Sequence, residues 1–303
     1  MPERRILITG GKGLVGSAID HPDVIKVCRQ HGDLRNLQEA ESIFRIYEPT
    51  HVIHCAAKVG GISPNMRYGG DFYRDNILIN TNVIDCCQMY QVEKIINFAS
   101  TCIFPDKVKY PLHVGQIFDG PPHPSNAPYA YAKRMAMVQL KAYWLQHGLK
   151  STTIIPCNIY GPHDNYQLDE CHVIPALISK CCRAKKYGKP FIVWGSGTPL
   201  REFIYSKDVA QYALHLLDHD CESMIVSVEK EISIKEVALM IAKIIDFTGD
   251  IIFDNERPDG QHRKPSNSEP CSRFREGKFE LTPFEEGLRE AIKYFQEEEL
   301  KWL

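Results

Sequence analysis

The 303-residue sequence has no long hydrophobic run, because no stretch approaches the roughly 20 apolar residues that a membrane-spanning helix needs. The apolar stretch near the N-terminus, ILIT, is also too short for a signal peptide. We therefore expect a cytoplasmic protein that does not interact with a membrane.

The sequence also has no large excess of positive or negative charge. Lys and Arg number 36 against 38 Asp and Glu, which gives a formal net charge of -2. A chain without a basic field does not attract nucleic acid, so no nucleic-acid partner is expected. Repeats and low-complexity tracts are missing as well. With 44% hydrophobic residues, the chain has the composition of a folded protein with one large domain or two closely packed ones.

Cysteine is not scarce, but the 11 cysteines form no CxxC motif and no zinc-finger spacing. The sequence therefore predicts no disulfide-exchange pair and no metal site. Without an export signal, most of these thiols are expected to be reduced and buried, including the adjacent pairs Cys86–Cys87 and Cys181–Cys182. Cys102 is the exception, because it lies in the segment STCIFP, where an apolar run ends.

Apolar runs alternate with helical patterns over the first half of the chain. Strands are predicted near the N-terminus, at His51–Cys55, at 94–100 and at 151–156. Helical spacing separates them, most clearly at 127–148, where Gly148 provides a stop signal. This alternation predicts an α/β protein with a doubly wound parallel sheet, the Rossmann fold, covered by helices on both faces.

The pattern changes after about Gly161. Helices are predicted at 172–188, 233–245 and 283–300, with short strands between them and a polar loop at 256–268. We expect these segments to form a smaller, discontinuous C-terminal α/β lobe that binds the substrate. The predicted division assigns two parts to the dinucleotide-binding domain, 1–163 and 200–222, and two to the substrate-binding lobe, 164–199 and 223–303.

The motif TGGKGLVG follows the first predicted strand and precedes a helix. Its glycines, Gly10, Gly13 and Gly16, permit a tight turn and let backbone amides approach a pyrophosphate. In this position the motif indicates a dinucleotide site, although a glycine turn can also be purely structural. The residues expected to form this part of the cofactor site are Gly10, Gly11, Lys12, Gly13, Leu14, Val15 and Gly16.

Two cationic residues lie where dinucleotide-binding proteins contact the 2'-position of the adenosine ribose. The second predicted strand ends near Arg29, at a place where an acidic residue favours NAD, and Lys12 lies within the glycine turn. Because cations suit a 2'-phosphate, NADP(H) is the expected cofactor. The alternative is that both residues are solvated surface charges.

The spacing YxxxK occurs twice, as Tyr90–Lys94 and as Tyr129–Lys133. On a helix this spacing places both side chains on one face, where the ammonium is expected to lower the pKa of the phenol. Tyr129–Lys133 begins a helix on the carboxyl side of the sheet, where ligands bind, whereas Tyr90–Lys94 precedes a strand. Ser100 ends that strand, so Ser100, Tyr129 and Lys133 are the predicted hydride-transfer residues.

Several longer motifs carry a resemblance to a known family. They span nearly the whole chain, and they are TGGKGLVGSAI, HCAAKVGGI, STCIFP, PYAYAKRM, NIYGPHDN, HVIPALI, VWGSGTPLREFIYSKD and PDGQHRK. With them the sequence resembles the extended short-chain dehydrogenase/reductases, and within that family the enzymes that act on a GDP-ketosugar. The resemblance implies a bifunctional 3,5-epimerase and 4-reductase that uses NADPH to convert GDP-4-keto-6-deoxy-D-mannose to GDP-L-fucose.

The resemblance also implies roles for a thiol and an imidazole. Inversion at C3 and C5 requires a base and an acid on opposite faces of the sugar ring. The family assigns these roles to the cysteine of STCIFP and the histidine of HVIPALI, which are Cys102 and His172 here. The alternative makes Cys102 a buried filler and His172 a helix-capping residue.

Further contacts follow from the same motifs. Besides the glycine turn and Arg29, the resemblance implies cofactor contacts at Ala56, Ala57, Lys58, Tyr129, Lys133, Pro156, Asn158, Ile159 and His172. It implies substrate contacts at Asn158, Lys180, Trp194, Arg201 and Lys264. Lys180 stands where relatives often have arginine; Trp194 could instead be core, and Arg201 and Lys264 could be surface charges. A homodimer through the helices at 71–90 and 127–147 is also implied.

Two rival functions remain open. A sugar-nucleotide 4-epimerase of the same fold would hold NAD tightly and show no net turnover of added cofactor. A non-catalytic regulatory subunit would keep the nucleotide fold as a binding platform. Such a platform has no need of the catalytic set Ser100, Cys102, Tyr129, Lys133 and His172.

Overall fold

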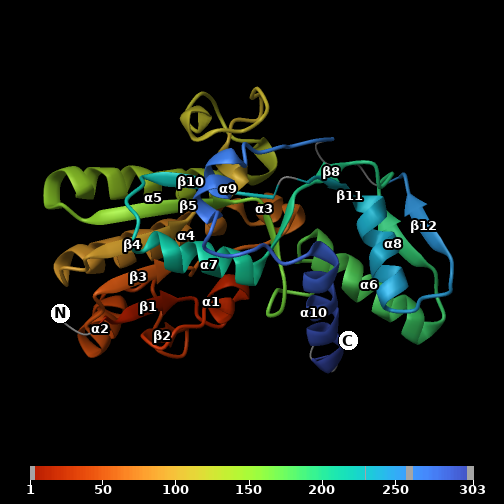
Figure 1. The fold of residues 1–303 in the computed structure, drawn as a ribbon, viewed down its shortest axis with the longest axis horizontal. Coiled ribbons are helices and arrows are strands. Elements are labelled where there is room, and N and C mark those ends of the chain that lie inside the picture. Colours follow the sequence, from red (N-terminus) through yellow and green to blue (C-terminus); the bar gives the residue numbers. More distant parts are fainter. Residues whose placement is uncertain (1–3, 229, 257–261, 299–303) are drawn as a thin grey trace.

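The computed structural model describes residues 4–228, 230–256 and 262–298. Its larger part is a six-stranded parallel sheet in the order β10-β5-β4-β3-β1-β2, with a smaller lobe beside it (Figure 1). The strands are β1 (Ile6–Thr9), β2 (Val24–Val27), β3 (His51–His54), β4 (Lys94–Phe98), β5 (Lys150–Pro156) and β10 (Ser223–Val226). The predicted doubly wound parallel sheet is therefore confirmed.

Helices cover both faces of this sheet. One face carries α2 (Leu37–Tyr47), α4 (Gly69–Met89) and α5 (Ala127–His147), and the other carries α1 (Leu14–Ala18), α7 (Ser206–Leu216) and α9 (Glu269–Arg275). Leu7, Val52 and Ile95 point into the first core, and the residue after each of them points into the second. Because both faces are buried, the strands are continuously apolar rather than alternating.

In the described residues, three helices and three two-stranded sheets contribute to the smaller lobe. Its helices are α6 (Val173–Tyr187), α8 (Ile234–Ile244) and α10 (Phe284–Glu297). Strand β7 (Phe191–Trp194) pairs in parallel with β12 (Ile251–Asp254), and β8 (Leu200–Arg201) pairs antiparallel with β11 (Ile232–Ser233). A further parallel pair, β6 (Asn158–Tyr160) with β9 (Phe203–Tyr205), contributes Tyr160, Phe203 and Tyr205 to the core of this lobe.

One predicted domain boundary is wrong. The division at residue 222 assigned everything after it to the substrate-binding lobe, but β10 begins at Ser223 and forms the edge of the main sheet beside β5. The later helix α9 also packs on this sheet, because Cys271 and Phe274 share a core with Met224 and Val226. The chain thus returns twice to the larger domain after the first crossing into the lobe.

Several element ends follow local signals in the sequence. Gly148 has φ +74° and ends α5, as predicted, because a glycine reaches the left-handed region without a Cβ penalty. Strands β2 and β4 end at Val27 and Phe98, two residues before the predicted ends at Arg29 and Ser100. The connections hold α3 (Ile62–Arg67) and three turns of 3-10 helix, η1 (Thr101–Ile103), η2 (Val114–Gln116) and η3 (Pro124–Asn126).

Two predicted segments extend beyond the described residues. The final predicted helix, 283–300, is described as α10 up to Glu297, and Glu299 and Leu300 lie outside the described residues. The polar loop at 256–268 is described only at Glu256 and from His262 onwards.

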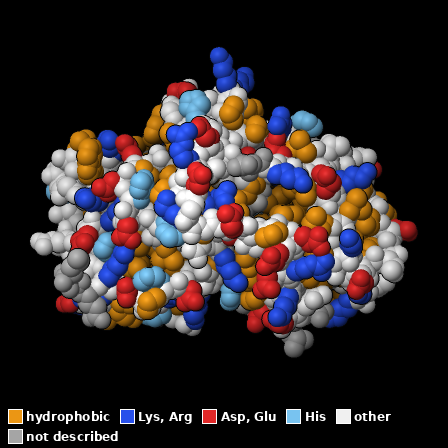
Figure 2. Space-filling model, in the orientation of Figure 1, with side chains coloured by type: hydrophobic (Ala, Val, Ile, Leu, Met, Phe, Trp, Pro, Cys, Tyr) orange, Lys and Arg blue, Asp and Glu red, His pale blue; other side chains and the backbone are white. Residues whose placement is uncertain are grey.

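The surface mixes charges of both signs. Lys and Arg side chains alternate with Asp and Glu over the visible face in Figure 2. Within the described ranges, no helix combines the length and apolarity needed to span a bilayer. The same ranges contain no cluster of three or more His, Cys, Asp or Glu side chains arranged to hold a metal ion.

Candidate active site

The predicted site residues gather at one edge of the main sheet. All six strands run in the same direction, so the segments that follow β1, β2, β3, β4 and β5 leave at a common edge. From β1 the chain passes first to β2 on one side and later to β3 on the other. Such a reversal of strand order opens a crevice outside the carboxyl ends, and dinucleotides bind there.

The glycine turn after β1 fits a dinucleotide phosphate. Gly10 has φ +68°, and a Cβ atom on it would lie 2.8 Å from the Ala56 nitrogen. A Cβ atom on Gly16 would lie 2.4 Å from the Gly10 oxygen. Gly13 donates its amide to the same oxygen at 2.9 Å. Side chains at these positions would fill the cradle, so the turn leaves backbone amides accessible to a pyrophosphate.

Lys12 and Arg29, the residues expected to contact a 2'-phosphate, lie in the glycine turn and in the segment after β2. Both residues are exposed, and the Nζ of Lys12 donates to the Oε1 of Gln30 at 2.8 Å. This contact ties the glycine turn to the segment after β2 that carries Arg29. The contact of these two cations with a 2'-phosphate stays a prediction.

The other expected cofactor contacts follow β3 and β5. Ala56, Ala57 and Lys58 come directly after His54 and Cys55, beside the glycine turn. Pro156 ends β5, and Asn158 and Ile159 lie in β6. The exposed Asn158 donates its side-chain amide to the Glu202 carbonyl at 2.8 Å, which anchors β6 against β9.

A buried polar chain beneath the glycine turn was not singled out from the sequence. The Oγ1 of Thr9 lies 2.7 Å from the Nδ1 of His54, and the Nε2 of His54 lies 3.1 Å from the Oδ1 of Asn80. Thr9 also accepts the amide of Ala56 at 3.2 Å. Burial lowers the pKa of His54 to about 3, so the imidazole is neutral. These hydrogen bonds link β1, β3 and α4. In the sequence, only the histidine of HCAAKVGGI points to them.

Tyr129 and Lys133 lie one turn apart in the first part of α5. The Nζ of Lys133 is 5.9 Å from the centre of the Tyr129 ring, and Phe72 meets that ring edge-on at 6.5 Å between centres. Lys133 is buried, and burial lowers its pKa to about 8. The predicted pair is therefore brought together, and its lysine is still mostly charged at neutral pH.

The expected decrease in the pKa of the phenol is not observed. Burial raises the pKa of Tyr129 above its ordinary value, and the neighbouring Cys102 raises it further. Desolvation of the phenolate is the main cause of this rise, and Lys133 is itself desolvated. Tyr129 therefore holds its proton at neutral pH, which is the state that a proton donor needs.

Ser100 and Cys102 lie in the turn that follows β4. Ser100 caps η1, and its Oγ accepts the amide of Cys102 at 3.4 Å. Burial raises the pKa of the Cys102 thiol, whereas the Ser100 contact and the charges of Lys264 and Lys133 act in the opposite direction. Cys102 thus lies close enough to Tyr129, Lys133 and Lys264 for their charges to interact, which is the predicted juxtaposition of thiol and hydride-transfer residues.

His172 lies at the N-cap of α6 but does not cap the helix with its side chain. The segment before it is tied to the loop after β3, because Gly61 donates its amide to the Glu170 carbonyl at 2.9 Å. The surrounding protein desolvates the imidazole and lowers its pKa, although the residue keeps substantial solvent exposure. The alternative of a capping histidine therefore loses its support, and the place of His172 opposite Cys102 stays a prediction.

Four of the predicted substrate residues form two neighbouring pairs. The Nζ of Lys180, on α6, lies 3.9 Å from the centre of the Trp194 ring at the end of β7. Trp194 is 54% exposed, so it is not a core residue. Burial lowers the pKa of both Lys264 and Arg201, and the charge of Arg201 lowers the pKa of Lys264 further. Lys264 also interacts with Cys102, which places this pair next to the thiol.

The second YxxxK motif lies away from the crevice. Lys94 begins β4 at the opposite edge of the sheet, where its buried Nζ donates to the His219 carbonyl and lies 3.6 Å from Asp220. Tyr90 packs on Phe44 at 5.9 Å between ring centres. These contacts support the fold, so the interpretation of Tyr90–Lys94 as a structural coincidence is confirmed.

The parallel sheet, the glycine turn and the Tyr–Lys pair together define a dinucleotide-binding protein of the short-chain oxidoreductase type. Residues 6–226 match the sequence model of the NAD dependent epimerase/dehydratase family. The chain belongs to that family.

The chain is also similar to named proteins over nearly its whole length. It is 44% identical over 307 residues to a GDP-L-fucose synthase of Dictyostelium discoideum, covering 97% of this chain and 95% of the relative. It is 38% identical over 316 residues to a probable GDP-L-fucose synthase of Drosophila melanogaster, with coverage of 97% and 98%. A GDP-L-fucose synthetase from Naegleria fowleri, solved bound to NADP, has a TM-score of 0.91 at 38% identity, covering 100% and 95%. The family expected from the motifs is confirmed.

Proposed function

We propose that the chain is an NADPH-dependent 3,5-epimerase and 4-reductase that converts GDP-4-keto-6-deoxy-D-mannose to GDP-L-fucose. Similarity to the Dictyostelium and Drosophila proteins supports the substrate class, and the NADP-bound Naegleria structure supports the cofactor. The observation that carries the proposal is the juxtaposition of the Cys102 thiol with Ser100, Tyr129 and Lys133 at the carboxyl edge of the sheet. A plain reductase needs the last three residues but not the thiol.

The cofactor site is the crevice described above. The turn from Gly10 to Gly16 holds the pyrophosphate, Lys12 and Arg29 hold the 2'-phosphate, and Ala56–Lys58 line the wall opposite. We assign Tyr129, Lys133, Pro156, Asn158, Ile159 and His172 to the nicotinamide end. NADPH, when bound, supplies the hydride that reduces C4.

Epimerisation is assigned to Cys102 and His172. The thiolate of Cys102 removes the protons at C3 and C5, each time leaving an enolate that Ser100 and Tyr129 stabilise through the C4 oxygen. His172, protonated from solvent before each inversion, delivers a proton to each carbon from the opposite face, and the Cys102 thiol returns its proton to solvent between the two inversions. Burial disfavours the thiolate, and the charges of Lys133 and Lys264 offset part of that penalty.

Reduction uses the same carbonyl-binding groups. As C4 gains a hydride, its oxygen takes the phenolic proton of Tyr129, and the charged Lys133 stabilises the phenolate that remains. Ser100 orients the oxygen by hydrogen bonding. One binding site for the C4 carbonyl thus serves both chemistries.

The substrate contacts are assigned to Asn158, Lys180, Trp194, Arg201 and Lys264. Asn158 is assigned to the sugar, and Lys180, Arg201 and Lys264 are assigned to the nucleotide diphosphate or ribose. The exposed Trp194 ring offers a stacking surface and Lys180 a charge above it. Arg201 and Lys264 supply cations next to the thiol, where a sugar diphosphate needs them.

A cytoplasmic homodimer through α4 and α5 is part of the proposal. Tyr131, Met135 and Val138 are exposed along one stripe of α5, and Leu78 is exposed on the neighbouring α4. Spacing of i, i+4 and i+7 gives a continuous apolar face, which a second copy of the chain would cover. The division into a cofactor domain and a substrate lobe, corrected for β10 and α9, is proposed with it.

The direct test supplies the purified chain with NADPH and GDP-4-keto-6-deoxy-D-mannose. The proposal expects NADPH to be oxidised in a one-to-one ratio with the GDP-L-fucose that chromatography detects. Retention of NAD through purification, with no net oxidation of added NADPH, would indicate a 4-epimerase instead. Binding of both ligands without turnover would indicate a regulatory subunit.

A further inference from the structure

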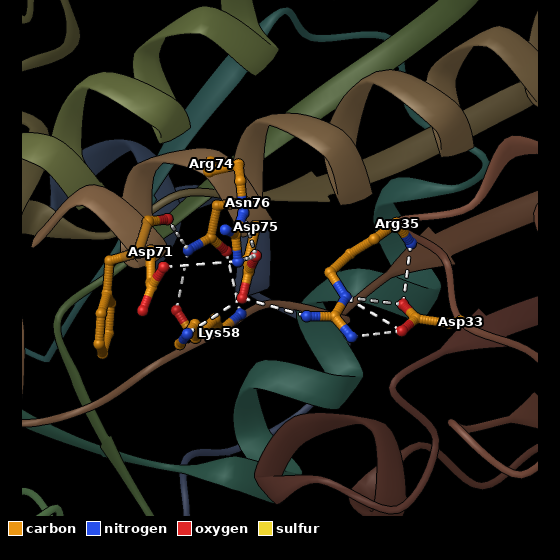
Figure 3. Close-up of polar contacts among 8 residues, drawn as sticks. Asp33, Arg35, Lys58, Asp71, Arg74, Asp75 and Asn76 are labelled. Carbon is orange, nitrogen blue, oxygen red and sulfur yellow. Dashed lines mark hydrogen bonds and ion pairs between the residues drawn. The ribbon is translucent and has the colours of Figure 1, made fainter. Parts of the chain in front are cut away.

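A cluster of seven polar residues lies beside the crevice, and most of them belong to no motif (Figure 3). They are Asp33 and Arg35 from the loop between β2 and α2, Lys58 from the segment after β3, and Asp71, Arg74, Asp75 and Asn76 from α4. Strands β2 and β3 flank β1 on opposite sides. The two connecting segments therefore border the adenosine half of the crevice.

Asp75 lies at the centre of this cluster, with only 5% of its side chain exposed. Its Oδ2 accepts hydrogen bonds from Nη1 of Arg35 at 3.3 Å and Nζ of Lys58 at 3.0 Å, and its Oδ1 accepts one from Nη2 of Arg74 at 2.8 Å. Burial alone would raise the pKa of Asp75, but the hydrogen bonds from Arg74 and Lys58 outweigh it, so its pKa lies below the ordinary value. The ionised carboxylate thus joins both segments to α4.

Arg35 is held by two carboxylates at once. Its Nε donates to both oxygens of Asp33 at 3.0 Å, while its Nη1 reaches Asp75. The hydrogen bonds from Arg35 lower the pKa of Asp33 to about 2. A guanidinium that donates to two carboxylates has few N–H groups left to bind a phosphate. Arg29, in the same loop, is exposed. Arg35 is therefore a bridge between the loop and α4.

Side-chain amides of α4 fix the backbone of the same two segments. Asn76 accepts the amide of Lys58 at 3.0 Å and donates to the carbonyl of Lys58 at 2.9 Å. Asn82, two turns further along α4, donates to the carbonyl of Leu34 at 2.8 Å. Each segment thus has its own neutral anchor on the helix, and Asp75 contacts a cation from both.

We propose that Asp75 is a positioning residue that fixes the spacing of the 28–36 and 56–61 segments around the adenosine half of NADP(H). The proposal rests on NADP(H) being the cofactor, as proposed above. Asp75 raises cofactor affinity by holding the two segments apart at the correct distance, without touching the reacting atoms. The net charge of the cluster does not account for this effect on cofactor affinity. The carboxylates of Asp33, Asp71 and Asp75 balance the cations of Arg35, Lys58 and Arg74.

The test compares Asp75→Asn with Asp71→Asn. Both variants remove one negative charge from α4, but Asp71 is half-exposed and contacts only the Arg74 side of the cluster, at 3.4 Å. Titration calorimetry with NADP+ is expected to show about 10-fold weaker binding for Asp75→Asn, which is about 1.4 kcal/mol, and a change below twofold for Asp71→Asn. Amide hydrogen exchange in 28–36 and 56–61 should accelerate only in Asp75→Asn. With saturating NADPH its kcat should stay within twofold of wild type while its KM for NADPH rises.

Equal or tighter NADP+ binding by Asp75→Asn would overturn the proposal and leave charge as the dominant effect. If NADP+ affinity, kcat and thermal stability all fall together in Asp75→Asn, Asp75 supports the fold in general and the proposal is wrong. If Asp75→Asn does not fold, Arg35→Met replaces it, because Lys58 and Arg74 still satisfy the carboxylate. This variant should bind NADP+ about 5-fold more weakly, with faster exchange confined to 28–36, and unchanged affinity refutes the bridge.

The NADP+ titration does not depend on sugar turnover. A wild-type chain that binds NADP+ but forms no GDP-L-fucose contradicts the proposed function and leaves the role of Asp75 to be decided by the variants. A wild-type chain that binds no NADP+ overturns both.

Discussion

The ammonium of Lys133 lies 5.9 Å from the centre of the Tyr129 ring, one turn further along α5. Burial lowers the pKa of Lys133 to about 8 and raises the pKa of Tyr129. At pH 7 the lysine is therefore charged and the phenol keeps its proton. A protonated phenol beside a cation can give its proton to a carbonyl oxygen and tolerate the phenolate that follows, so the pair is suited to reduction.

The first prediction concerns the pH dependence of this pair. Since the pKa of Lys133 is lowered to about 8 from 10.5, the lysine loses its charge as pH rises through about 8. We expect kcat/KM for reduction to fall above that pH, measured as NADPH oxidation across a series of buffers. Lys133→Met should be about 100-fold slower and lack this alkaline decline. A wild-type rate that stays constant up to pH 10 contradicts the role of Lys133.

The second prediction separates the two chemistries at Cys102. In Cys102→Ser, formation of GDP-L-fucose should fall by about 1,000-fold, because a serine hydroxyl, unlike a thiol, does not ionise to a base at accessible pH. Slow 4-reduction of the unepimerised sugar should persist, since Ser100, Tyr129 and Lys133 remain. Product chromatography resolves the two outcomes.

Cys221→Ser is the matched control for that experiment. Cys221 lies just before β10, at the opposite edge of the sheet, where its carbonyl accepts from Thr152. The control should form GDP-L-fucose at the wild-type rate. A normal rate in Cys102→Ser as well would show that the thiol is not the base.

The third prediction assigns the opposite face of the sugar to His172. In His172→Gln, Cys102 can still remove and return a proton on its own face, but no group delivers one to the other face. In D2O the substrate should therefore gain deuterium at C3 without inversion, which NMR and mass spectrometry detect together. Inversion at the wild-type rate would remove His172 from the mechanism.

Much of this site could be predicted because its residues lie in short motifs next to strand ends. Gly10–Gly16 and Tyr129–Lys133 follow local rules of spacing, and Ser100 follows from its place at a strand end, whereas the role of Cys102 is implied by the resemblance. The Rossmann sheet could also be predicted from continuous apolar runs. These features depend on neighbours in the chain, so the sequence contains them.

Other features depend on packing between distant segments. Strand β10 is four residues long, and nothing in SMIV distinguishes the edge of the main sheet from a strand of the smaller lobe. The cluster around Asp75 joins Arg35, Lys58 and Arg74, whose charges resemble ordinary surface residues when the sequence is read alone. The raised pKa of Tyr129 arises from burial, which spacing does not reveal.

The fourth prediction tests the pair formed by Lys180 and Trp194. Lys180→Met removes the cation 3.9 Å from the indole, so the KM for the sugar nucleotide should rise about 10-fold with little change in kcat. Lys180→Arg should stay within about threefold of wild type, because arginine keeps the charge and stacks on an aromatic ring. Steady-state kinetics at saturating NADPH measure both values. A change in kcat alone would place Lys180 in the chemistry rather than in binding.

The fifth prediction tests the dimer through α5. Met135 is 38% exposed and lies between Tyr131 and Val138 on the apolar stripe. Met135→Glu would bury a carboxylate against the partner's helices, which costs several kcal/mol when the charge stays unpaired. Light scattering after gel filtration should therefore show a monomer, whereas Leu239→Glu, an equally drastic change on the exposed side of α8, should leave the dimer intact. If Met135→Glu keeps the mass of a dimer, the contact lies elsewhere, and a monomeric wild-type chain would refute the dimer itself.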